Sequence, residues 1–210
     1  KRRPVDPYGD SKTVIEELIE QLGDTHNLEW TILRPHNLFG EGCYMKDMYR
    51  GVIPIFMNRI MRSENPLYIF GEGHRRAFSY MGDCISGFIH AIDDPKTNHQ
   101  IINLGGREPI LIIDLAQAII KEYEDWIIEG RIQKIDIRVV EPRPHEVASA
   151  YCTSEKSEKL LNYQESIGWL RGIKRTVAWA KKCGPQEWKR ENLILLNEKA
   201  PLVWREMITN

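Results

Sequence analysis

The stretch PYGDSKTVIEELIEQLG, residues 7–23, is followed closely by LEWTIL, residues 28–33, and this pair decides the fold class. Asp6 is a favourable N-cap residue, and Pro7 fits the first helical position because its missing N–H costs nothing there. Apolar residues then recur three and four positions apart until Gly23 ends the run, which predicts a helix. The second segment is rich in β-forming residues, and the arginine–proline pair after it bars a helix, so it predicts a strand entering a loop.

The rest of the chain alternates between the same two kinds of element. Helical spacing predicts helices near residues 52–62, 85–92, 111–126, 155–161 and 173–182, and β-rich runs predict strands at 67–70, 77–81, 101–104 and 135–140. Strands that alternate with helices indicate an α/β fold. The long loop at 36–48 carries glycine, asparagine and aromatic residues, and loops of this length are often functional.

The composition is that of an ordinary globular protein of one or two domains, with 210 residues, 42% apolar and 28% charged. Twenty-nine basic against thirty acidic residues leave a formal charge of −1, so neither nucleic acid nor a membrane surface is an expected partner. No apolar run approaches the roughly 18 residues that a membrane span needs. Four cysteines without a C-x-x-C pair indicate reduced thiols in the cytoplasm, and six histidines without ligand spacing predict no metal site.

Tyr8 and Lys12 stand four residues apart on the first predicted helix, so both side chains lie on one face. A phenol is a poor base at neutral pH unless a nearby cation favours the phenolate, and Lys12 is placed to be that cation. On spacing alone, a solvated pair of helix residues is the more common explanation. Only the surrounding sequence can separate the two interpretations.

Six segments supply that context, in this order along the chain: PYGDSK (7–12), WTILRPHNLFGEG (30–42), LYIFGEGHRRAFSYMGDCISGFIHAI (67–92), INLGGREPILIIDLAQAI (102–119), EPRPHEV (141–147) and GIKRTVAWAKK (172–182). Together they closely resemble the extended short-chain dehydrogenase/reductase family, in its nucleotide-sugar epimerase and dehydratase branch. The resemblance covers nearly all of residues 4–184. It implies the C-terminal part of a Rossmann-like parallel sheet plus a smaller α/β substrate-binding domain.

The resemblance implies NAD as cofactor and gives roles to four residues near it. Tyr8 matches the catalytic tyrosine that exchanges a proton with the sugar hydroxyl. Lys12 matches the lysine that holds the nicotinamide ribose and keeps that tyrosine acidic. Pro35 and His36 fall where the family's backbone touches the nicotinamide end of the cofactor. Without the resemblance, these last two would be interpreted as a strand end and a turn.

The same resemblance implies a site for a nucleotide-diphosphate sugar. Asn37 falls where a side-chain amide meets the substrate, Tyr68 and Phe70 where the nucleotide base is cradled, and Glu146 where an acidic residue meets ribose hydroxyls.

Two arginines complete the expected substrate site. Arg76 and Arg143 match the pair that clamps the substrate diphosphate, which suits guanidinium groups because each forms bidentate, charge-assisted bonds. The turn that begins at Gly73 is one residue shorter than the family pattern, so Arg75 is the alternative to Arg76.

We therefore expect NAD-dependent epimerisation of a nucleotide-diphosphate sugar, similar to a UDP-glucose 4-epimerase. A nucleotide-sugar 4,6-dehydratase and a non-catalytic nucleotide-sugar-binding fragment are the alternatives. No G-x-G-x-x-G turn is found among the fifteen glycines, so the isolated chain is expected to be inactive. The expected domains are the tyrosine helix and last Rossmann-like strands at 1–50, the nucleotide-sugar-binding domain at 51–184 and a tail at 185–210. A homodimer is expected because exposed strand edges are adhesive.

Overall fold

A computed structural model describes residues 2, 4–143 and 146–189 of the chain. In chain order the elements are α1 (Pro7–His26), β1 (Thr31–Pro35), β2 (Leu38–Phe39), α2 (Val52–Met61), β3 (Leu67–Phe70), β4 (Arg75–Arg76), β5 (Ser79–Tyr80), α3 (Met81–Asp93), the 3-10 turn η1 (Pro95–Thr97), β6 (Gln100–Leu104), β7 (Ile110–Leu111), α4 (Ile112–Lys121), α5 (Glu124–Ile128), β8 (Ile137–Val140), β9 (Ser149–Ala150), α6 (Glu155–Leu161) and α7 (Gly168–Cys183). Within this described part of the chain, no helix combines the length and apolarity needed to cross a membrane.

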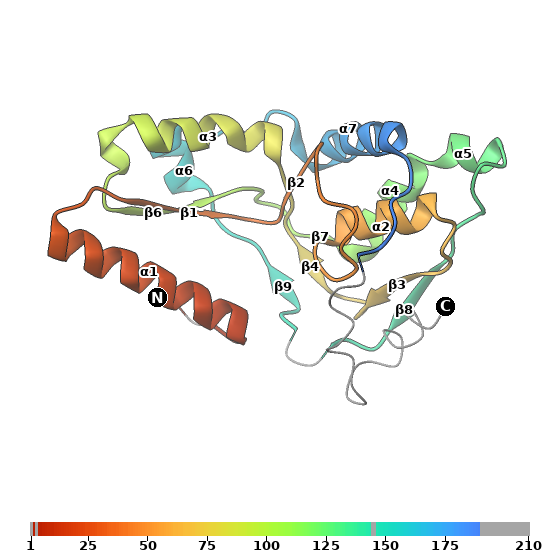
Figure 1. The fold of residues 1–210 in the computed structure, drawn as a ribbon, viewed down its shortest axis with the longest axis horizontal. Helices are drawn as coiled ribbons and strands as arrows, with labels where there is room; N and C mark the ends of the chain where they lie inside the picture. The colour runs from red at the N-terminus through yellow and green to blue at the C-terminus, as the bar shows by residue number, and fades with distance from the viewer. Residues whose placement is uncertain (1, 3, 144–145, 190–210) are drawn as a thin grey trace.

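One end of the molecule is built on the parallel strand pair β1 and β6, which we call the sheet lobe (Figure 1). Helix α1 lies along one face of this pair, and α3 and α6 cover the other face. The N-terminal end of α1 points to the same side as the carboxyl ends of both strands. In α/β folds this is the side on which ligands bind.

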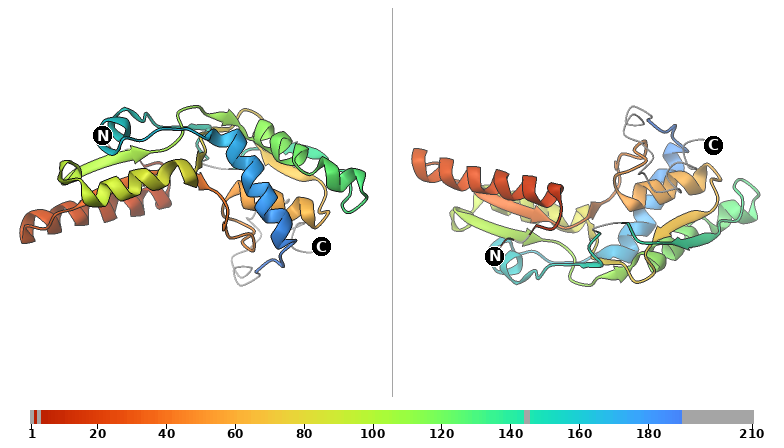
Figure 2. Two further views of the ribbon diagram at one scale, coloured as in Figure 1. Left: turned by 90° about the horizontal axis from the view of Figure 1, so that it is seen from above. Right: turned by 90° about the horizontal axis from the view of Figure 1, so that it is seen from below.

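The other end, which we call the pocket lobe, contains the second parallel pair, β3 and β8, with α2, α4, α5 and α7 (Figure 2). Its core is one apolar cluster to which helices and strand β3 all contribute. The short strands between the lobes pair β2 with β5 and β4 with both β7 and β9. The α/β class with parallel strands is therefore confirmed.

Helix α1 is attached to the sheet lobe mainly by charge. Glu16 is 9% exposed and accepts hydrogen bonds from both Arg2 and Arg34, with 2.7 Å between Arg34 Nε and Glu16 Oε1. The apolar side chains that predicted this helix are exposed instead, as is a second row on α3. They are Val14, Ile15, Leu18 and Leu22 on α1, and Ile85, Ile89 and Ile92 on α3. An ion pair of limited exposure thus orients α1 on strand β1.

The predicted end of the first helix is wrong by three residues. The helix continues past Gly23 to His26, and Asn27 ends it in the left-handed conformation with φ 52°. Gly23 serves packing instead, because a Cβ there would come within 2.3 Å of the Trp30 ring. A glycine that admits a neighbouring ring looks the same in sequence as one that stops a helix.

Two predicted elements differ from the structure. The strand expected at 77–81 is shortened to β5 at 79–80, which pairs with β2, because β4 is a separate strand at 75–76 and Met81 already opens α3. The helix expected at 111–126 breaks after α4, and Tyr123 is fully buried at the break. The apolar spacing runs across the break because Tyr123 packs edge-on against Trp126.

Other boundaries shift by a few residues. Strand β1 lies at 31–35 rather than 28–33, β8 begins at 137 rather than 135, and α7 begins at 168 rather than 173. The division into domains at 50 and 184 stays a prediction. The predicted tail lies outside the described residues from 190 onward.

Glu16→Gln should loosen α1 at pH 7. Hydrogen bonds from Arg34 hold the pKa of Glu16 below its ordinary value of 4.5. Burial of the carboxyl acts in the opposite direction and raises the pKa, while the hydrogen bond from Arg2 lowers it further. A depressed carboxyl pKa stabilises the fold above pH 4.5, and this contribution is lost as the pH falls through the folded-state pKa. We expect roughly tenfold faster amide exchange in α1 for the variant at pH 7, and convergence with the parent in acid.

Glu17→Gln is the matched control, because Glu17 is 53% exposed in its side chain and makes only a 3.9 Å pair with Arg2. Equal exchange in both variants would contradict an ionic attachment of α1.

Candidate functional site

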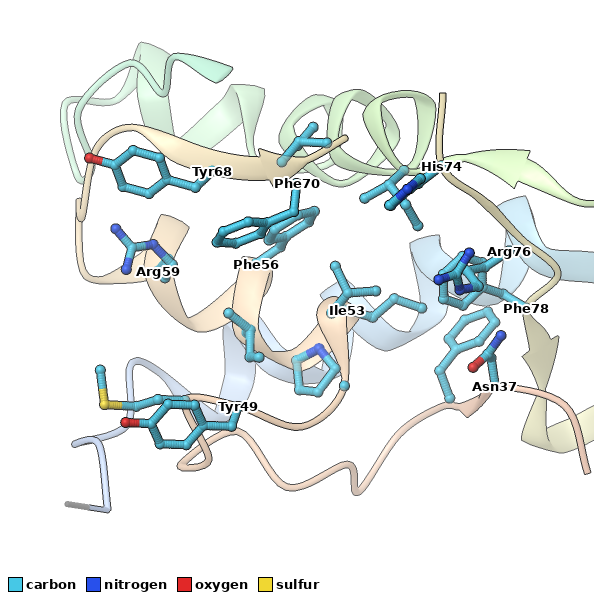
Figure 3. A pocket seen from close by; sticks show the side chains of 18 of the residues that line it. Asn37, Tyr49, Ile53, Phe56, Arg59, Tyr68, Phe70, His74, Arg76 and Phe78 are labelled. Carbon is cyan, nitrogen blue, oxygen red and sulfur yellow. The ribbon is translucent and has the colours of Figure 1, made fainter. Parts of the chain in front are cut away.

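A pocket of about 310 Å³ lies in the pocket lobe, between α2, β3 and the segments that carry Arg76, Arg143 and Glu146 (Figure 3). All six residues that the sequence assigned to the substrate line it: Asn37, Tyr68, Phe70, Arg76, Arg143 and Glu146. They come from four parts of the chain, at 37, 68–70, 76 and 143–146. The structure brings them together without testing the role of any one of them.

Strand β3 supplies an aromatic wall. Its residues alternate, so that Leu67 and Ile69 are buried in the core while Tyr68 and Phe70 face the pocket. The guanidinium carbon of Arg143 lies 4.8 Å from the centre of the Phe70 ring. This wall offers flat apolar faces against which a planar ring can stack.

A charged group lies beside this aromatic wall. Arg143 makes two 3.0 Å bonds to the Glu146 carboxylate, and Arg76 Nη2 lies 3.4 Å from the same group. Burial lowers the pKa of Arg76, and Glu146 opposes that shift, but a guanidinium keeps its charge in either case. Two positive groups facing one carboxylate leave a net positive charge, which suits a diphosphate.

Arg76 rather than Arg75 lines the pocket. Arg75 is exposed, and its Nη1 bonds the carbonyl of Pro109 at 3.4 Å. The two side chains point to opposite sides of β4, because successive strand residues alternate. Of the two candidates it is therefore Arg76 that faces the pocket, and its role there stays a prediction.

Asn37 sits just beyond β1, in the left-handed region with φ 42°. Its Nδ2 donates to the Ala77 carbonyl at 2.7 Å, and its own carbonyl accepts from the Ser79 N–H. The neighbouring His36 carbonyl accepts from Ser79 Oγ at 2.7 Å, and the His36 ring Nε2 lies 3.0 Å from the Ala150 carbonyl. These bonds fix the turn through which β1 leads into the pocket.

Tyr8 and Lys12 lie away from the pocket lining, on the first turns of α1. Tyr8 is 71% exposed, and Lys12 Nζ lies 5.4 Å from the centre of its ring. Both are at the N-terminal end of α1, on the side of the carboxyl ends of β1 and β6, where Pro35 and His36 also lie (Figure 1). The four residues expected near a cofactor thus share one edge of the sheet lobe.

Two basic side chains of the pocket, Arg59 and His74, were not predicted from the sequence. Ile53, Phe56 and Arg59 recur every three residues on α2 and share one face, so the spacing could have placed Arg59 beside the apolar lining. His74 is 8% exposed, and its Nδ1 lies 3.7 Å from Glu146 Oε2. No sequence pattern marks His74.

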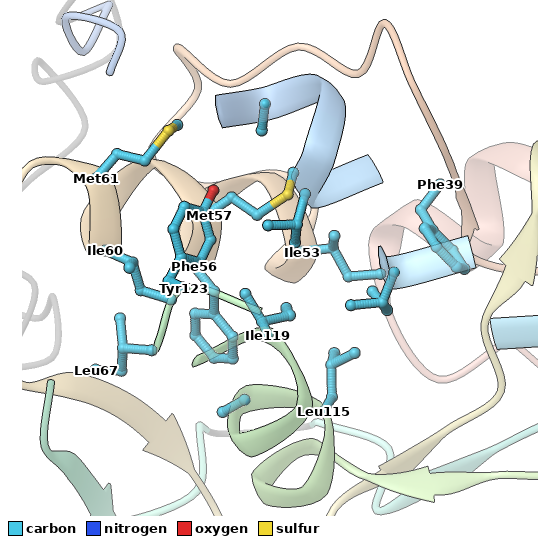
Figure 4. Packing of buried hydrophobic residues seen from close by; sticks show 14 of the residues in the cluster. Phe39, Ile53, Phe56, Met57, Ile60, Met61, Leu67, Leu115, Ile119 and Tyr123 are labelled. Atoms are coloured by element: carbon cyan, nitrogen blue, oxygen red, sulfur yellow. The ribbon is translucent and has the colours of Figure 1, made fainter. Parts of the chain in front are cut away.

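The remaining faces of α2 hold the helix rigidly behind the pocket. Met57 and Ile60 are fully buried against a cluster that includes Leu115 and Ile119 of α4 (Figure 4). A well-packed helix fixes the positions of its pocket-facing side chains.

Comparison with known proteins identifies the family of the chain. The model of the NAD dependent epimerase/dehydratase family matches residues 1–105, and the chain belongs to this family. A Methanocaldococcus jannaschii protein named as a provisional UDP-glucose 4-epimerase is 33% identical over 85% of this chain and 54% of its own length. The dTDP-D-glucose 4,6-dehydratase of Mus musculus is 26% identical over 86% of this chain and 49% of its own.

The solved structure of a Bacillus cereus UDP-glucuronic acid 4-epimerase, in complex with UDP-glucuronic acid and NAD, superimposes with a TM-score of 0.71. It is 25% identical and covers 86% of this chain and 54% of its own. The chain spans about half the length of the curated relatives it matches.

Proposed function

We propose that this chain carries the nucleotide-sugar site and the tyrosine helix of an NAD-dependent epimerase acting on a nucleoside-diphosphate sugar. The observation that carries this proposal is the meeting of Arg76, Arg143 and Glu146 beside the aromatic wall of β3. One elongated pocket thus offers charge for a diphosphate and flat surfaces for a base.

In this proposal the arginines bind the two phosphates, and Tyr68 and Phe70 hold the base. Glu146 accepts hydrogen bonds from the ribose hydroxyls. Asn37, at the end of the pocket nearest the sheet lobe, contacts the sugar. The support is that Tyr68 and Phe70, then Arg76, then Asn37 follow one another across the pocket in Figure 3, with Glu146 bonded beside Arg76.

The residues at the edge of the sheet lobe fit the nicotinamide end of NAD. Lys12 Nζ lies 5.4 Å from the centre of the exposed Tyr8 ring, and both residues stand where an α/β sheet binds dinucleotides. When bound, NAD accepts a hydride from a sugar carbon and returns it. Tyr8 would take the proton from the sugar hydroxyl and give it back, Lys12 would hold the ribose, and Pro35 and His36 would border the nicotinamide.

The test is an assay of a protein that joins this chain to a glycine-rich dinucleotide-binding half, supplied with UDP-glucose and NAD. The expected product is the 4-epimer. A 4-keto-6-deoxy sugar would identify a 4,6-dehydratase instead, a candidate supported by the mouse relative. Binding of the UDP-sugar without turnover of any kind would favour the non-catalytic alternative.

A homodimer in the cytoplasm belongs to the same proposal. The exposed row Val14, Leu18 and Leu22 on α1 supports self-association, because burying such a row removes apolar surface from water. The described cysteines are unpaired, which fits a reducing compartment. We expect light scattering of the 210-residue chain to give the mass of a dimer, and Leu18→Glu to give a monomer. A parent monomer would contradict the proposed dimer.

A further inference from the structure

Arg59 is a buried cation at the aromatic end of the pocket. Its side chain is 8% exposed and lines the pocket three residues along α2 from Phe56. The guanidinium carbon lies 5.9 Å from the centre of the Tyr68 ring (Figure 3). Arg76 and Asn37 lie at the opposite end. The two ends of the pocket therefore each carry a guanidinium group.

The internal partners of Arg59 satisfy only part of its hydrogen-bonding capacity. Nη2 donates to the Pro66 carbonyl at 3.3 Å, Nη1 lies 3.4 Å from Glu64 Oε2, and the buried Nε has no hydrogen-bond partner. The other oxygen of Glu64 is already taken, by Arg62 at 2.7 Å and by Trp188 at 2.8 Å. A guanidinium has five N–H donors, so Arg59 retains donor capacity that a pocket ligand can use.

Leaving such a group buried is costly unless something accepts its protons. Burial lowers the pKa of Arg59 and Glu64 raises it, but an arginine stays protonated in proteins. An apolar side chain at this position would fill the wall between Phe56 and Tyr68 at lower cost. The arginine is explained if the ligand presents an oxygen at this end of the pocket.

We propose that Arg59 selects the nucleobase of the substrate by donating a hydrogen bond to a carbonyl oxygen at the pyrimidine 4-position. This inference rests on the proposed function, since it places the base against the aromatic wall and the diphosphate at Arg76. Figure 3 shows Arg59 beside Tyr68, at the end away from Arg76, so a base that lies along Tyr68 and Phe70 with its ribose toward Arg76 would direct its outer edge toward Arg59. Uracil has a carbonyl oxygen at that edge, whereas cytosine has an amino group.

The amino group of cytosine is itself a donor, so it would face the N–H groups of Arg59 without forming a bond. A site built to donate a hydrogen bond rejects an analogue that cannot accept it, because the buried donors are then left unpaired. Arg59 thus gives the pocket a preference for UDP over CDP, two ligands that share ribose and diphosphate.

The experiment is calorimetric titration of the 210-residue chain with UDP and with CDP. We expect the parent to bind UDP at least about tenfold more tightly. Arg59→Met should weaken UDP binding about tenfold and change CDP binding less than about threefold, so that the two affinities converge. Arg62→Met is the matched control, because Arg62 contacts the same Glu64 but does not line the pocket, and it should keep the preference.

Equal affinity of the parent for UDP and CDP would overturn the inference even if Arg59→Met failed to fold. Equal weakening of both ligands by Arg59→Met would also overturn it, since Arg59 would then act only as an anchor for Pro66. Both results leave the proposed function standing. Failure of the folded parent to bind either nucleotide would overturn the proposed function, and this inference with it.

Discussion

Tyr8→Phe, made in a protein that joins this chain to a dinucleotide-binding half, is expected to lower kcat by about 10²- to 10⁴-fold with little change in KM. The hydroxyl is the only group removed, and in the proposed reaction it exchanges a proton with the sugar. Tyr8 is not among the residues that line the pocket, so the bonds that bind the nucleotide remain. Loss of a proton-transfer group with intact binding lowers turnover rather than affinity.

Steady-state kinetics with the UDP-sugar measure this split between kcat and KM. Tyr44→Phe is the control, since Tyr44 is 55% exposed and lies outside the pocket lining. Lys12→Met should affect both cofactor affinity and rate, because Lys12 has two proposed contacts. A Tyr8→Phe enzyme whose turnover stays within about threefold of its parent would remove Tyr8 from the mechanism.

The pocket residues could be predicted from the sequence through the family resemblance, and part of their arrangement also follows from local patterns. Alternation along β3 places Tyr68 and Phe70 on one face whatever surrounds the strand. The pairing of Arg76 with Glu146 could not come from pattern alone, because the two are 70 residues apart. The parallel pairing of β4 with β9 brings the segment of Arg76 next to the segment of Glu146. The sequence alone does not show this pairing, and the two residues were predicted to share a site only because of the family resemblance.

The features that escaped prediction depend on tertiary contacts. The burial of Arg59 depends on Glu64, Pro66 and the tail residue Trp188, whereas the sequence shows only a cation on an apolar helix. In the same way, the sequence predicts Gly23 as the end of the helix, whereas the structure shows that the Trp30 ring packs against this glycine. Periodicity indicates which face of an element is apolar, and tertiary contacts decide what that face meets.

Removal of either arginine of the charged group should greatly weaken binding of a nucleoside diphosphate. Arg76→Ala and Arg143→Ala each delete a charge-assisted partner of the diphosphate, at an expected cost of about 2–5 kcal/mol. That range corresponds to roughly 30- to 4,000-fold in Kd. Arg143 also lies over the Phe70 ring, so its removal affects the aromatic wall as well, and we expect the larger loss there.

Arg75→Ala is the matched control, since it deletes a neighbouring charge that lies outside the pocket. Titration with UDP at two salt concentrations separates direct bonds from the general electrostatic field of the protein. Salt screens the attraction of UDP to exposed charges more strongly than it screens the bonds to part-buried arginines.

Glu146→Gln provides a further test of the charged group. It removes the negative charge between the arginines, so inorganic pyrophosphate should bind more tightly, while UDP loses the carboxylate that accepts from its ribose. Unchanged UDP affinity in both arginine variants, or a loss confined to Arg75→Ala, would place the diphosphate elsewhere on the molecule.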